Sequence, residues 1–457
     1  MGGIFKFNVM EDDSMENVKL KRTLKTKDLV VFGLVFMIPL APAGMYGTYL
    51  GLSGGMVALC YLIGMVAMFF TGMSYRVMSQ KFPLAGSVYV YVQKGVSPFL
   101  GFLTGWSILL DYFLMPATVV IIGSSFGNAL VPAIPVWGWV LAFIAFSTIV
   151  NVIGVDFMSK CSWILFVLQL VVIVAFVGCV IKLLLNGTIH FSTISFYNPG
   201  HFNISKILQA TGIVILSYLG FDAINTMAEE TINPEKSVGR AIILSILIIG
   251  LIFIVITFFA GMAYPAYQKL NEGTAFIDVV AFVGGKWLTV LTSITLIVSF
   301  GIATTQASQA AVARVLFAMA RDGALPKQLA YVNKKFQTPV VATLFVAIVI
   351  TPLALLCSLT QIATLVSFGA LFGFMLLNIA VVNLFFLQNK KKETVTTKHV
   401  FQYMICPLIG FAVTLWIFIN LSIDAHIVGG LWILAGFLYL LSITKLFTCP
   451  VPQIELN

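Results

Sequence analysis

Apolar runs of roughly 20 residues alternate with short polar segments along almost the whole chain of 457 residues. A run of that length is what an α-helix needs to cross about 30 Å of hydrocarbon. We therefore predict an all-α integral membrane protein with twelve transmembrane helices. They are expected to begin near residues 29, 55, 98, 134, 160, 204, 238, 285, 339, 360, 399 and 426.

Two of the predicted helices contain helix-breaking residues at matching places. The first helix is interrupted at residues 39–44 (PLAPAG) and the sixth at residues 217–222 (SYLGFD). A broken membrane helix leaves backbone N–H and C=O groups that lipid cannot satisfy, so the breaks must face protein or a watery cavity. Two such helices five spans apart indicate two inverted five-helix halves, with a transporter's binding site between them.

The spacing of the predicted helices divides the chain into five parts. Residues 1–28 form a cytoplasmic tail, residues 29–186 the first five-helix repeat and residues 187–203 an extracellular loop. Residues 204–388 form the second repeat, and residues 389–457 hold accessory helices eleven and twelve with the C-terminus.

Composition supports a membrane protein and predicts its orientation. Hydrophobic residues make up 60% of the chain and charged residues 9%, against about 25% charged residues in soluble domains. The net charge of +9 is a topology signal rather than a sign of nucleic-acid binding, because the outer loops hold only Lys182, Lys206, Lys269 and Lys286. The positive-inside rule then places both termini in the cytoplasm of a plasma-membrane protein.

Motifs for enzymatic or metal chemistry are absent from the sequence. The six cysteines show no CxxC or Cys/His ligand spacing, and no HExxH, GxSxG or GxGxxG motif occurs. We therefore predict no catalytic residue, no metal and no cofactor.

Asp111 is the clearest ionisable residue inside a predicted span, about ten residues into the third helix. A carboxylate at the centre of a membrane helix costs about 2.5–3.5 kcal/mol on insertion scales, and such residues mark functional sites by default. We expect Asp111 to bind a cationic amine through a charge-assisted hydrogen bond. The alternative is a structural, hydrogen-bonded acid packed against a neighbouring helix.

The breaks supply the remaining candidate site residues. Asp222 follows the break in helix six and is a candidate for proton coupling, for capping of the second half-helix, or for both. Glu229 and Glu230 are interpreted as surface or gate ion pairs rather than substrate ligands. The candidate substrate-binding residues besides Asp111 are Tyr112, Pro39, Ala43, Gly44, Ser217, Tyr218, Gly220 and Phe221.

Three motifs in order make the chain resemble the amino acid–polyamine–organocation (APC) superfamily. They are KFPLAGSVYVY at residues 81–91, GFDA through AEETINP at residues 220–234, and AMARDGALP at residues 318–326. The resemblance runs from about Lys21 to Lys445. Residues 105–116 of the third helix look most like the bacterial putrescine importer branch.

The resemblance implies the LeuT-like fold, with five-plus-five inverted repeats and substrate held among helices one, three, six, eight and ten. It implies that Asp111 faces the cationic end of a substrate, that Asp222 is linked to proton coupling, and that Ser308 lines the site where a relative has an aromatic residue. This chain departs from many members in its Pro-rich first break and in Gln169, which stands where many have a lysine.

The leading hypothesis is a secondary transporter that imports a small organic amine, such as putrescine or a related monoamine, with protons as a further partner and lipid as its surroundings. The alternative within the superfamily is an amino-acid importer or exchanger, whose substrate carboxylate would sit at the first break. A transport-like channel or sensor is the alternative from another class.

Overall fold

A computed structural model describes residues 22–84, 88–270, 274–321, 323, 325–333, 335–357, 359–388, 396–421, 423–449 and 451. The described residues are helical almost throughout, and their one β-bridge pairs Leu24 with Thr231. The α-helices are α1 (Thr26–Phe36), α2 (Ala41–Ser53), α3 (Val57–Lys81), α4 (Val88–Gly95), α5 (Pro98–Leu130), α6 (Val136–Ile153), α7 (Val155–Leu185), α8 (Ile204–Val214), α9 (Pro234–Ala263), α10 (Ala275–Val298), α11 (Thr305–Arg321), α12 (Val340–Leu356), α13 (Leu359–Val382), α14 (Thr397–Val400), α15 (Cys406–Ile419) and α16 (Ile423–Ile443).

Shorter helical turns join or extend these helices. The 3₁₀ segments are η1 (Ile215–Tyr218), η2 (Asp222–Glu230), η3 (Tyr267–Lys269) and η5 (Lys327–Ala330). The π-helical segments are η4 (Ser299–Thr304), η6 (Asn383–Leu387) and η7 (Phe401–Ile405).

Helix lengths and composition confirm a multi-pass helical membrane protein. Among the described residues, ten helical stretches are long and apolar enough to cross a membrane, and the bent pair α1 and α2 makes an eleventh. α12 is also apolar but only 17 residues long. The predicted number of twelve spans therefore stays a prediction.

The first break extends to both sides of the predicted residues 39–44. α1 ends at Phe36 and α2 begins at Ala41, but the backbone of Met45 is again non-helical (φ −135°, ψ 20°), so residues 41–44 form one helical turn between two interruptions. The helix restarts there because Pro42 occupies the first turn of α2, where a missing N–H is tolerated and the fixed φ angle suits a helix start. The two helices meet at an angle of 46°.

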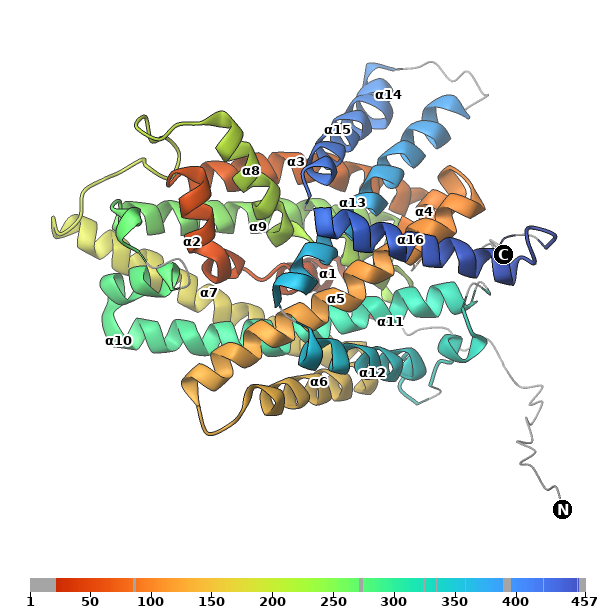
Figure 1. Ribbon diagram of the computed structural model, residues 1–457, viewed down its shortest axis with the longest axis horizontal. Coiled ribbons are helices and arrows are strands. Elements are labelled where there is room, and N and C mark those ends of the chain that lie inside the picture. Colours follow the sequence, from red (N-terminus) through yellow and green to blue (C-terminus); the bar gives the residue numbers. More distant parts are fainter. Residues whose placement is uncertain are drawn as a thin grey trace.

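The long helix α5 carries Asp111 through the molecule. Ser97 caps its start by accepting a hydrogen bond from the Leu100 N–H at 3.2 Å, and Pro98 takes the first helical position. Its 33 residues span about 50 Å, more than the hydrocarbon thickness. Figure 1 shows α5 crossing the bundle obliquely, while α6 and α12 lie together along one edge. This course brings α5 against α4, α6, α11, α12 and α13.

Candidate functional site

The break between α1 and α2 is strained and is held by a neighbouring helix. Ile38 has a φ of 53°, a left-handed conformation that is a genuine outlier for a β-branched residue. The Thr304 hydroxyl of η4 donates to the Val35 carbonyl at 2.9 Å. The π-helical segment η4 therefore adds a hydrogen bond to the Val35 carbonyl at the end of α1, which also accepts from the Ile38 N–H at 3.3 Å.

The break between η1 and η2 meets the first break directly. Gly220 has a φ of 117°, and a Cβ there would lie 2.0 Å from Cδ1 of Phe36, the last residue of α1. Only glycine combines this backbone conformation with such a close approach. The two broken helices thus touch at their discontinuities, as the sequence predicted from their matching positions.

Asp222 holds the second break and links it to α5. Its Oδ1 accepts from the Gly220 N–H at 3.2 Å, and its Oδ2 accepts from the Tyr112 hydroxyl at 2.5 Å. Asp222 is 1% exposed. The carboxylate therefore satisfies backbone of the break itself, and it lies in the first turn of η2, where the capping hypothesis placed it.

Asp111, the residue before Tyr112, is 4% exposed. Among the described residues no hydrogen bond or ion pair to its carboxylate is found. α13 packs tightly behind it, because a Cβ on Gly369 would lie 2.9 Å from the Asp111 backbone nitrogen. Asp111 is thus a buried acid that pairs with no described residue, and it directly precedes Tyr112, whose hydroxyl binds Asp222 of the second break.

The start of α2 offers few hydrogen-bond donors to a ligand. The Ala41 N–H donates to the Ile38 carbonyl at 2.7 Å, and the Ala43 N–H donates to the Leu40 carbonyl at 2.9 Å. Pro42 has no N–H. Three of the first four donor positions of this helix are therefore used or missing, and these are the positions that bind anions at other helix starts.

One face of α2 is accessible beyond the break. Gly44 and Gly51 are exposed, and Thr48 between them is half-buried. Thr48 and Gly51 line a cavity of about 560 Å³ together with His201 and Tyr267. Thr48 and Gly51 are three residues apart and lie on one helix face, whereas Gly44 lies before the kink at Met45. This face points toward the side predicted to be extracellular.

The other predicted site residues are engaged in packing or in hydrogen bonds of their own. The Tyr218 hydroxyl donates to the Tyr61 carbonyl of α3 at 2.8 Å, and the Ser217 hydroxyl bonds the Tyr61 hydroxyl at 3.1 Å. The Ser308 hydroxyl donates to the Thr304 carbonyl of the preceding turn at 2.6 Å. The Phe221 ring packs edge-on against Tyr75, while Pro39 is buried and Ala43 half-buried. These residues pack or bond within the protein near the breaks. Their role as substrate ligands stays a prediction.

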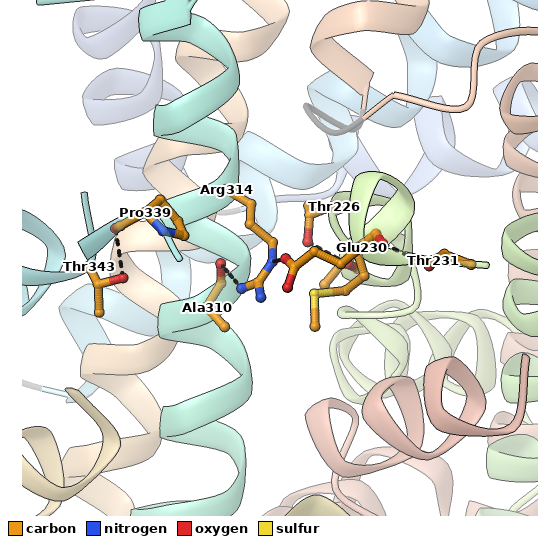
Figure 2. Close-up of polar contacts among 9 residues, drawn as sticks. Thr226, Glu230, Thr231, Ala310, Arg314, Pro339 and Thr343 are labelled. Carbon is orange, nitrogen blue, oxygen red and sulfur yellow. Dashed lines mark hydrogen bonds and ion pairs between the residues drawn. The ribbon is translucent and has the colours of Figure 1, made fainter. Parts of the chain in front are cut away.

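A buried ion pair joins α11 to the end of η2. Figure 2 shows Arg314 on α11 pointing at Glu230 at the end of η2. The two side chains are 5% and 1% exposed, and Arg314 also donates to the Ala310 carbonyl at 2.9 Å. The neighbouring Glu229 pairs with Arg321 at 2.8 Å nearer the surface. Both glutamates thus form ion pairs, as the sequence interpretation held.

The N-terminal segment adds a second contact at the same place. The N–H groups of Thr23 and Leu24 each lie 3.0 Å from the Glu230 carbonyl, and the Ile232 N–H donates to the Leu24 carbonyl at 2.8 Å. Residues 23–24 are thereby fixed to the end of η2, next to the ion pair. This contact lies on the side that carries the excess of basic residues.

Sequence reasoning missed Arg314 and the hydroxyl group of Tyr61. The signal for Arg314 is an arginine inside the apolar run of residues 310–320, which membrane helices rarely contain without a partner. Tyr61 carries no such signal, because a single tyrosine in a membrane helix is common. Groups of three or more His, Cys, Asp or Glu side chains that suit a metal ion do not occur among the described residues.

Comparison with known proteins defines the class of the molecule. A family model described as amino acid permease matches residues 29–443. The chain belongs to this family, within the APC superfamily, and is a membrane transporter rather than an enzyme.

Individual relatives cover almost the whole chain. The low-affinity putrescine importer PlaP of Escherichia coli (strain K12) is 33% identical over 443 residues, covering 96% of this chain and 97% of the relative. The branched-chain amino acid permease BcaP of Bacillus subtilis (strain 168) is 25% identical, with 96% and 98% covered. The methylthioribose transporter of the same organism is 26% identical, with 96% and 97% covered.

Proposed function

We propose that this protein is a secondary transporter of the plasma membrane that imports a small organic amine, putrescine or a related polyamine or monoamine, by alternating access. The observation that carries the proposal is that Asp111, buried beside the crossing of the two breaks, pairs with no described residue. A carboxylate in the membrane interior is expensive unless it is paired. An ammonium group of the substrate is the partner that this site lacks.

The donor pattern at α2 favours an amine over an amino acid. The α-carboxylate of a zwitterion needs free N–H groups, and the Ala41 and Ala43 N–H groups are already bonded within the break. An amine needs acceptors instead, which Asp111 and the carbonyl groups of the breaks supply. The 33% identity to a putrescine importer agrees with this choice.

The two ends of the site fit one state of an alternating-access cycle. The α2 face with Thr48 and Gly51 lines a cavity on the side predicted to be extracellular. The Glu230–Arg314 ion pair and the bound N-terminal segment close the other side. Import then requires that the ion pair separate once the amine has neutralised Asp111.

Two sources of free energy are available for import. A negative-inside membrane potential contributes about 2.3 kcal/mol per positive charge per 100 mV, so a dication is drawn inward without further coupling. Asp222 is the proposed proton-coupling residue, because it is buried and bonds both to the break and to Tyr112 on the helix of Asp111.

The test is uptake of radiolabelled putrescine into proteoliposomes with a negative-inside potential and an inward proton gradient. We expect accumulation against the putrescine gradient, competition by unlabelled amines, and no competition by leucine. The variant Asp111→Asn should lose uptake. The matched control Asp424→Asn, at an exposed position of α16, should keep it.

Each other outcome assigns a different function. Competition by leucine with weak putrescine uptake would replace the amine proposal with an amino-acid carrier. Uptake that only equilibrates and never accumulates under an applied gradient would indicate a channel. Unchanged putrescine affinity in folded Asp111→Asn would give Asp111 a structural role.

A further inference from the structure

An apolar groove of about 820 Å³ runs between α5, α11, α12 and α16, outside the proposed substrate site. Asp111 is not among its lining residues, although Leu110 is. Its walls include Trp106, Leu316, Leu344, Ile348 and Trp432. Its volume lies in the range of pockets that hold small organic ligands.

Two indole rings form a fixed wall of this groove. The Trp106 Nε1–H donates to the Trp432 carbonyl at 2.9 Å, and the Trp432 Nε1–H donates to the Trp106 carbonyl at 2.8 Å. The rings stack with centroids 5.1 Å apart. Because both polar hydrogens are bonded to backbone, the rings present apolar surface to whatever fills the groove.

Water and a polar solute are poor occupants of this groove. An ordered water molecule needs two to four polar partners, and apart from the two indoles the one polar lining residue among those described is Gln328. The open side is apolar, since Ile348 is 71% exposed and Leu344 47% exposed on the apolar helix α12. In a membrane protein, an exposed apolar face of this kind contacts hydrocarbon. A hydrocarbon chain is the filler that the surroundings provide.

A lysine near one end of the groove favours a lipid with an anionic headgroup. Gln328 lies on η5, directly after Lys327, and both are exposed. η5 follows α11 in the loop whose basic residues place it in the cytoplasm. A lysine at that depth attracts anionic headgroups of the cytoplasmic leaflet.

We propose that the groove binds an acyl chain of one anionic phospholipid, with the headgroup at Lys327. Lipid tails are as apolar as leucine, so entry from the bilayer brings no hydrophobic free energy. The preference for the anionic lipid therefore comes from the headgroup. One nearby lysine corresponds to about a fivefold preference over a zwitterionic lipid.

The test uses the two tryptophans as reporters of an acyl chain that carries bromine, which quenches indole fluorescence on contact. The full-length protein is reconstituted into phosphatidylcholine vesicles with increasing brominated phosphatidylglycerol or brominated phosphatidylcholine. We expect half-maximal quenching at an about fivefold lower mole fraction of the anionic lipid. Trp106 and Trp432 are two of seven tryptophans. The other five give background quenching, which we expect to be the same for both brominated lipids.

Three variants distinguish quenching by a lipid in the groove from quenching by lipid elsewhere on the surface. The double variant Val341→Phe/Val349→Phe fills the groove and should remove the excess quenching by the anionic lipid. The matched double variant Val171→Phe/Val174→Phe, on the exposed face of α7, should keep it. Lys327→Gln should bring the two lipids to equal quenching.

Three results would overturn the proposal. They are equal quenching by both lipids in the unaltered protein, unchanged excess quenching in the filled variant, and an unchanged preference in Lys327→Gln. If the filled variant does not elute as a single folded species, the unaltered protein and the surface substitution Lys327→Gln decide the question by themselves.

Discussion

The buried ion pair at the closed end of the site gives the sharpest prediction. In the variant Glu230→Gln, Arg314 keeps its positive charge and its bond to the Ala310 carbonyl but loses the opposing carboxylate. The guanidinium is then an uncompensated charge in a side chain that is 5% exposed. Removal of one partner from a buried pair destabilises proteins by about 3–5 kcal/mol.

The magnitude for this site lies near the lower end of that range. Glutamine still accepts one neutral hydrogen bond from Arg314, so we expect a loss of about 3 kcal/mol. If the pair exists only while this end is closed, the same loss shifts the closed-to-open equilibrium by about two orders of magnitude. With an unfolding entropy of about 2.1 cal/mol/K per residue, 3 kcal/mol lowers the midpoint of thermal unfolding by about 3 °C.

The neighbouring residue provides the control. Glu229→Gln removes the same chemistry from the pair with Arg321, whose side chains are 36% and 16% exposed, and exposed pairs contribute about 0–1 kcal/mol. The assays are the temperature at which half of the detergent-solubilised protein remains monodisperse and the putrescine uptake rate. The double variant Glu230→Gln/Arg314→Met should recover stability, because it leaves no buried charge. Equal midpoints for Glu230→Gln and Glu229→Gln would refute the reasoning.

Three further substitutions test the crossing of the breaks. Gly220→Ala places a Cβ 2.0 Å from the Phe36 ring, so we expect no folded protein in size-exclusion chromatography, whereas Gly51→Ala, with no atom within 4 Å, should fold. Asp222→Asn should abolish stimulation of uptake by an inward proton gradient while potential-driven uptake persists; stimulation equal to that of the unaltered protein would exclude Asp222 from coupling. Tyr112→Phe removes the donor to Asp222 and should lower the unfolding free energy by about 1–3 kcal/mol, and an unchanged thermal midpoint would contradict the bond.

The helices were predictable because hydrocarbon enforces long apolar segments. Most predicted helix starts fall within a few residues of the observed ones, as for Pro98 and Ile204. The eighth start, expected near residue 285, coincides with Gly285, where the backbone leaves the helical region inside a helix that begins at Ala275. The apolar pattern alone does not distinguish a kinked helix from a new one.

The two interruptions of the first span, before Ala41 and at Met45, could not be read from its prolines. Pro39 lies in the break, but Pro42 starts α2, and a proline is compatible with either place. What decides between them is the strained φ of Ile38 together with the support of Val35 by Thr304, about 270 positions later in the sequence. Such a long-range contact leaves no local pattern.

In the candidate site, too, single unusual residues could be predicted from the sequence, whereas contacts between distant helices could not. The acid in the third helix and the glycine in the sixth are visible in the sequence, because each is rare or costly where it stands. That Tyr112 and not Asp111 bonds Asp222 depends on the rotation of α5 against η2. The sequence places Asp111 and Tyr112 side by side, but it does not tell which of the two bonds Asp222.

This division of roles has a consequence for the charge of the substrate. Asp222 already receives two hydrogen bonds, from Gly220 and Tyr112, and two of the N–H groups at the start of α2 are bonded within the chain. Among the described residues, these bonds satisfy Asp222 and two donors at the start of α2, but none reaches the Asp111 carboxylate. Under the proposed function, the ligand that completes the site brings positive charge and needs no carboxylate. A zwitterion would pair with Asp111 yet desolvate its carboxylate without adequate donors, which is the penalty that lets one site discriminate between an amine and an amino acid.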